Sequence, residues 1–136
     1  MSTKTYHGSC HCGRVRFKAD LDLSQGTGRC NCTFCHKARW WGFMTKPAAF
    51  TLLSGEDSLG DYQGPNNTQG HHLFCKHCGI RVFGKGHVPE IGGDYVSVSL
   101  AALDDVSPEE LMQGPLRFIN GRDNDWFKPP AFTRHL

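Results

Sequence analysis

The sequence lacks any apolar run long enough to cross a membrane. No stretch of about 20 consecutive apolar residues occurs, so we expect no transmembrane helix. The start, MSTKTYHGSC, also lacks the basic segment followed by an apolar one that marks a secretory signal. We therefore expect a cytoplasmic protein, in a compartment where thiols stay reduced.

Basic runs, repeats and low-complexity tracts are missing too. The formal net charge is only +2, and no Lys/Arg-rich run suggests binding to nucleic acid. If all seven cysteines were thiolates on two zinc ions, the net charge would become −1, and the mild basicity would disappear. No linker divides the 136 residues, so we expect one domain over 1–136 with an irregular tail from about residue 121.

Short alternating segments dominate the chain, which predicts a mainly β fold of short antiparallel sheets. Residues 14–21 and 94–100 alternate most clearly between apolar and polar side chains. Further strands are predicted at 40–45, 49–55, 58–63, 71–75, 80–84 and 116–120, with a turn at 64–70. Helix is scarce. A capped start at Ser107 and Pro108 predicts a short helix over 107–114, and a second short one fits 33–40. We expect Trp126 and Phe127 to dock the tail against the body.

Cysteine is the residue type that carries the chemistry. The seven cysteines are Cys10, Cys12, Cys30, Cys32, Cys35, Cys75 and Cys78. An odd number cannot close completely into disulfides, and short clustered spacings in a reducing compartment are typical of metal ligation. We therefore expect zinc rather than disulfides, with separate buried thiols as the alternative.

The spacing divides these cysteines into a set of four and a set of three. Cys75-x-x-Cys78 is followed by Gly79, which is the pattern of a zinc knuckle. Cys10-x-Cys12 can present two sulfurs on one face of an extended chain. Together the two pairs supply the four ligands of a closed structural zinc site, which would join the N-terminal segment to the middle of the chain.

The remaining three, in CNCTFCHK, leave two interpretations open. The group could be a second closed site, with His36, His71, His72 or another residue as fourth ligand. Alternatively it is an open site, with three protein ligands and one exchangeable position. Three thiolates leave zinc a poor Lewis acid for making hydroxide but well suited to holding an incoming thiol as thiolate. The open interpretation therefore indicates thiol chemistry and not hydrolysis.

Three segments carry a family resemblance. GSCHCGRVRF, CNCTFCHKARWWG and FCKHCGIRVFGKG, in that order, resemble the glutathione-dependent formaldehyde-activating family, which includes relatives of centromere protein V. The resemblance runs from about residue 5 to 104 and includes YVSVSLAALDD at 95–105. It implies the Mss4-like all-β fold with two zinc sites.

The resemblance also implies roles for the two sets. Cys10, Cys12, Cys75 and Cys78 would be structural, and Cys30, Cys32 and Cys35 would form the catalytic zinc site that holds glutathione or its sulfur. The implied activity is that of an S-(hydroxymethyl)glutathione synthase, a carbon–sulfur lyase acting on glutathione and formaldehyde. Asn31 departs from the family, which often has His at that position.

Side chains next to the set of three could have a role in function, or they could be ordinary surface or core residues. Lys37 and Arg39 could offset an anionic zinc site and attract the carboxylates of glutathione, or they could belong to a solvated helix face. His36 could donate to a ligand, bind the metal or carry a proton. We expect Trp40 and Trp41 to pack the core beside the site rather than to recognise a ligand. The competing function is a zinc-stabilised binding module with two structural metal sites and no catalysis; a zinc ribbon that binds nucleic acid is disfavoured by the charge.

Overall fold

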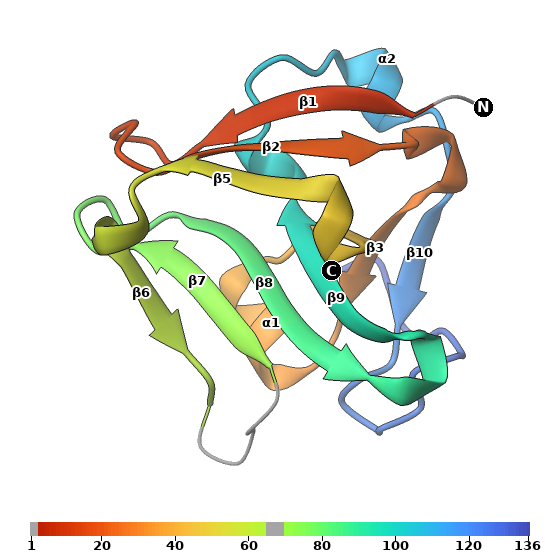
Figure 1. The fold of residues 1–136 in the computed structure, drawn as a ribbon. Coiled ribbons are helices and arrows are strands. Elements are labelled where there is room, and N and C mark those ends of the chain that lie inside the picture. Colours follow the sequence, from red (N-terminus) through yellow and green to blue (C-terminus); the bar gives the residue numbers. More distant parts are fainter. Residues whose placement is uncertain (1–2, 65–69) are drawn as a thin grey trace.

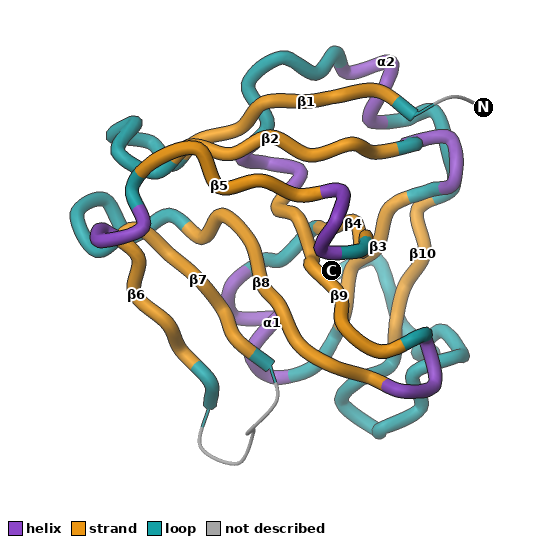
Figure 2. Tube along the Cα trace, in the orientation of Figure 1, coloured by secondary structure: helices purple, strands orange, loops and turns teal. Residues whose placement is uncertain are grey.

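The computed structural model describes residues 3–64 and 70–136, and its elements are mostly strands. The strands are β1 (Lys4–Ser9), β2 (Arg16–Leu21), β3 (Thr27–Cys30), β4 (Gly42–Thr45), β5 (Phe50–Ser54), β6 (Leu59–Tyr62), β7 (His71–Cys75), β8 (Arg81–Val88), β9 (Gly93–Ser99) and β10 (Leu116–Ile119). The α-helices of the described part are α1 (Thr33–Ala38) and α2 (Pro108–Leu111). Figure 2 shows that most strands are joined by loops and short turns, so the expected mainly β fold is confirmed.

The strands form two sheets that lie one above the other in Figure 1. The smaller sheet has the order β1-β2-β5, and the larger has the order β10-β3-β4-β9-β8-β7-β6. Every pair is antiparallel except β10 with β3, which is parallel. The expectation of antiparallel strands alone was therefore wrong at this edge. A strand from the end of the chain lies there beside the strand that carries Cys30.

Aromatic and aliphatic side chains fill the space between the sheets. Phe50 of β5 stacks on Phe17 of β2 and also meets Phe83 of β8, with ring centroids 5.3 Å and 4.5 Å apart. Each such aromatic contact adds about 1 kcal/mol to the burial of its apolar area. The fully buried side chains of this core include Val15, Phe17, Leu21, Leu23, Val82, Val98 and Leu100.

Helix α2 is held by its cap. The Ser107 hydroxyl accepts from the Glu110 N–H at 3.1 Å, and the Glu110 carboxylate accepts from the Ser107 N–H at 3.0 Å. The same carboxylate accepts from the Tyr6 hydroxyl and the Lys4 ammonium of β1, which lowers the pKa of Glu110 to about 2. The helix stops at Leu111, three residues before the predicted end at 114.

Two regions differ from the sequence expectations. Strand β1 was not predicted, because only Tyr6 and Gly8 of its residues are buried and the apolar alternation is weak. Trp126 and Phe127 were expected to dock the tail, but they are 49% and 80% exposed. The predicted turn at 64–70 falls largely outside the described residues. None of the helices in the described ranges is long and apolar enough to cross a membrane.

Candidate functional site

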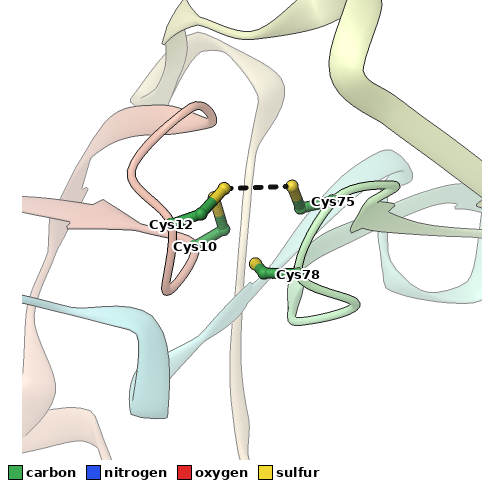
Figure 3. A group of neighbouring side chains, drawn as sticks. All are labelled: Cys10, Cys12, Cys75 and Cys78. Atoms are coloured by element: carbon green, nitrogen blue, oxygen red, sulfur yellow. Dashed lines mark hydrogen bonds between the residues drawn. The ribbon is translucent and has the colours of Figure 1, made fainter.

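Four cysteine sulfurs meet where the two sheets come together. Cys10 and Cys12 lie in the turn between β1 and β2, while Cys75 ends β7 and Cys78 lies in the turn before β8 (Figure 3). The four sulfur atoms all lie within 4.8 Å of one another. The Cys10–Cys12 sulfurs are 3.6 Å apart and the Cys12–Cys75 sulfurs are 3.7 Å apart. Tetrahedral zinc with Zn–S bonds of about 2.3 Å needs sulfurs roughly 3.8 Å apart, so these residues fit a closed metal site.

Backbone N–H groups turn toward these sulfurs, as a bound thiolate requires. Val15 N–H donates to the Cys10 sulfur at 3.3 Å, and His77 N–H donates to the Cys75 sulfur at 3.4 Å. A backbone hydrogen bond from Cys12 is the largest cause that lowers the pKa of the Cys78 thiol, to about 6. Gly79 has φ +79°, the left-handed conformation that the knuckle turn needs. The turns are thus built to hold thiolates.

The second group comes from one short stretch of chain. Cys30 ends β3, Cys32 is the N-cap of α1, and Cys35 lies in the first half of that helix. The Cys32 sulfur accepts a hydrogen bond from the Cys35 N–H at 3.3 Å. The thiol thus caps the start of the helix, a role that Ser or Asp usually has. The three sulfurs lie within 4.8 Å of one another.

Protons are shared within this group. Hydrogen bonding, first with Cys30 and then with Cys35, lowers the pKa of the Cys32 thiol to about 2. The same contacts, again with Cys30 first, raise the pKa of the Cys35 thiol well above its usual range. A second or third thiolate among these sulfurs would lie beside the first negative charge and is disfavoured without a cation. Three thiolates at this separation therefore require a cation between them, and the group could hold a metal ion.

No described His, Asp, Glu or further Cys joins these three sulfurs as a fourth donor. His71 instead pairs with Asp61, at 2.6 Å between the ring Nδ1 and the carboxylate. The His72 ring accepts from Arg81 at 2.9 Å. His36 follows Cys35 directly, but its buried Nδ1 has no hydrogen-bond partner among the described residues, and its ring lies against His135. The geometry favours the open interpretation over a site closed by histidine.

Asn31, between the first two of these cysteines, is buried and fully engaged. Its side-chain amide donates to the Asn120 side chain at 2.9 Å, and its side-chain oxygen accepts from the Arg122 N–H at 3.0 Å. The backbone carbonyl of Asn31 accepts from the Arg122 guanidinium at 2.9 Å. Asn31 therefore binds the segment that follows β10.

Arg81, which the sequence expectations missed, lies against α1 from β8. Its guanidinium carbon is 3.9 Å from the centroid of the Trp40 ring and 4.7 Å from that of Phe34. Two of its nitrogens, Nε and Nη1, are buried without a hydrogen-bond partner among the described residues. Burial lowers the pKa of Arg81 to about 10, while Cys35 and Cys32 act in the opposite direction. The side chain remains a cation at neutral pH, and it interacts electrostatically with Cys35 and Cys32. Its signal in the sequence was a single arginine in the apolar strand IRVFG.

A small cavity opens beside the group of three. It offers ≈ 10 Å³ to a water-sized molecule, which is room for about one water. Its lining is basic and aromatic as well as sulfur-bearing: Arg29, Cys30, Cys35, His36, Arg39, Trp40 and Leu136. Trp40, which was expected to pack the core beside the site, lines this cavity. Trp41, in contrast, packs against the core and donates to the Thr27 hydroxyl at 2.8 Å.

The fold and the two cysteine groups define a small β protein with two places that could each hold a metal ion, compatible with zinc. The chain belongs to the glutathione-dependent formaldehyde-activating enzyme family, whose model matches residues 5–116, and its fold is accordingly Mss4-like. A crystal structure of a Rhodobacter sphaeroides protein is similar, with a TM-score of 0.66 and 27% sequence identity. That similarity covers 82% of this chain and 99% of the other. The family resemblance predicted from the sequence is confirmed.

Proposed function

We propose that the protein is a zinc-dependent carbon–sulfur lyase that binds a thiol, glutathione in the first instance, at Cys30, Cys32 and Cys35. There it forms or breaks the adduct of that thiol with a small aldehyde such as formaldehyde. Cys10, Cys12, Cys75 and Cys78 would hold a second, structural zinc. We place this enzyme in the cytoplasm, where its free cysteines would stay reduced and able to bind metal.

One observation carries this proposal: the group of three has no fourth donor among the described residues, whereas the other group has four. A closed structural site has no use for an open position, and a thiol-binding site requires one. When bound, zinc would supply a positive centre that favours the thiolate form of an incoming thiol at neutral pH. Family membership supports the choice of glutathione and formaldehyde.

The chain's own residues contribute charge and position. Arg81 supplies a buried cation close to the thiolates, and Arg29 and Arg39 line the cavity beside Cys30 and Cys35. A carboxylate-bearing thiol would be attracted to this basic lining. In the reaction, the sulfur–carbon bond forms, the carbonyl becomes a hydroxyl, and the thiol proton ends on that oxygen. Electrons balance without an oxidant or reductant.

The direct test is a titration of the Co²⁺-substituted protein with glutathione. We expect two Co²⁺ ions per chain and a sulfur-to-metal absorption band that grows as one equivalent of glutathione binds. Exchange NMR of glutathione with ¹³C-formaldehyde should then show faster adduct formation than in buffer. Albumin at the same concentration controls for nonspecific thiols. If glutathione leaves the absorption band of both metal ions unchanged and does not speed adduct formation, the result would support the non-catalytic binding module instead.

Arg81 should be needed for tight thiol binding at the group of three. Arg81→Met removes the cation while keeping an unbranched side chain of similar length, and Arg81→Lys keeps the charge. We expect the Co²⁺-loaded Met variant to bind glutathione about tenfold more weakly, because a bound thiolate adds a negative charge near Arg81 and a unit charge at moderate distance in protein is worth on the order of 1–2 kcal/mol. Titration of the sulfur-to-metal absorption band measures this. Equal affinity in both variants and the parent would contradict it.

A further inference from the structure

The segment that follows β10 lies over the group of three, although it is outside the residues that the family model matches. The N–H of Asn31 donates to the carbonyl of Ile119 at 3.1 Å as β10 ends beside β3. The chain then passes Asn120 and Arg122, both hydrogen-bonded to Asn31. Asn31 and Asn120 are each 8% exposed, so this contact is a firm root for the segment.

Gly121 brings the backbone of the segment against the site. A Cβ atom added at this position would lie 2.8 Å from the Cys30 sulfur and 2.7 Å from the Trp126 ring. Since no real side chain tolerates such contacts, only glycine allows the backbone to pass this close. Residues after β10 thus form one wall of the sulfur group.

The far end of the segment returns to the same place from another side. The Arg39 guanidinium donates to the backbone carbonyl of His135 at 2.9 Å. The His135 ring lies 5.6 Å from that of His36, and Leu136 lines the cavity together with Cys30 and Cys35. With these residues in place the cavity accepts about one water, so no thiol of the size of glutathione fits.

Contacts between the root and the far end are few. Phe127 and Phe132 are 80% and 78% exposed, and Trp126 is 49% exposed. A segment with little buried apolar area opens at low free-energy cost. The hydrogen bond from Arg39 to His135 is therefore a large part of what keeps the far end closed.

We propose that residues 121–136 form a lid over the group of three, rooted at Asn31. As the lid opens, Arg39 exchanges the carbonyl of His135 for a carboxylate of the incoming ligand. The lid thereby selects thiols that carry a carboxylate within reach of the sulfur. The identity of the ligand in this inference rests on the proposed function. The existence of the lid does not depend on it.

The selection is tested with two small thiols on the Co²⁺-loaded full chain. 3-Mercaptopropionate carries a carboxylate and 2-mercaptoethanol does not, and their affinities are compared after correction for the acidity of each thiol. We expect the parent to prefer the former by about tenfold, the value of one charge-assisted hydrogen bond. Arg39→Met should abolish the preference and speed the association of 2-mercaptoethanol severalfold. Arg134→Met is the matched control, because it removes an exposed arginine of the lid residues 121–136. This variant should behave like the parent.

The proposal is overturned if Arg39→Met keeps the preference, or if Arg134→Met loses it to the same degree. The lid has a separate test in the His135→Gly/Leu136→Gly variant. Association of both thiols should be faster in this variant with the preference retained, and an unchanged rate would overturn the lid. If the parent binds neither thiol, the proposed function fails, and the lid is judged by the rate at which a chelator removes Co²⁺ from the group. Faster removal from the double variant supports the lid, and equal rates reject it.

Discussion

Cys78→Ser is expected to leave the chain unfolded at 25 °C, even with excess zinc. The group of four is the place where the turn between β1 and β2 meets the turn between β7 and β8, so it joins the two sheets. A structural zinc contributes apparent free energies of about 10–16 kcal/mol, comparable to the whole stability of a small domain. Near-ultraviolet circular dichroism should show loss of fixed aromatic packing.

His77→Ser is the matched control for that variant. His77 lies in the same knuckle with an exposed side chain, and only its backbone N–H contacts a sulfur. We expect the melting temperature of this variant to stay within a few degrees of the parent. A Cys78→Ser protein that melts as cooperatively as His77→Ser would show that the group of four does not hold the sheets together.

Cys32→Ser is expected to keep the fold and abolish thiol binding. The Ser hydroxyl can accept from the Cys35 N–H as the thiol does, so α1 keeps its cap and the cost in stability is below about 1 kcal/mol. The metal group, however, loses one of three sulfurs. We expect the affinity for glutathione to fall by more than about 100-fold, since a metal site needs its full ligand set to hold a further ligand.

Two measurements separate this outcome from a structural one. Thermal unfolding reports the fold, and metal analysis should give one ion per chain instead of two. Thr33→Ser, a change in the next residue that spares the sulfurs, should bind glutathione like the parent. If Cys32→Ser and Cys78→Ser lose the same stability, both groups are structural and the catalytic proposal fails.

The cysteine spacing alone was enough to predict how the sulfurs are grouped. Each pair or triplet of sulfurs is oriented by a local turn of the backbone. Such turns are specified by short sequence motifs, for example the knuckle at Cys75–Gly79. The same holds for α2, whose cap residues mark its start. Strand positions followed from alternation where the buried face carries apolar side chains, as in β2 and β9, but not in β1.

What surrounds the group of three could not be predicted in the same way. The contact of Asn31 with Asn120, and that of Gly121 with the Cys30 sulfur, join residues roughly 90 positions apart without any local pattern. Arg81 stood out only as a single arginine in an apolar strand, and its partners could not be predicted because Phe34, Trp40 and His72 lie on other parts of the chain. The tail was misjudged because apolar composition indicates burial only on average, and Phe127 stays in solvent.

The parallel pairing of β10 with β3 has a consequence for synthesis on the ribosome. All four sulfurs of the sheet-joining group are present once Cys78 has been made, so this group could bind a metal ion while the chain is still growing. The wall beside Cys30 cannot form until Gly121 has been synthesised, which happens much later. During that interval the nascent chain presents Cys30, Cys32 and Cys35 without their cover. The group of three is thus the first to have all its sulfurs and the last to be enclosed.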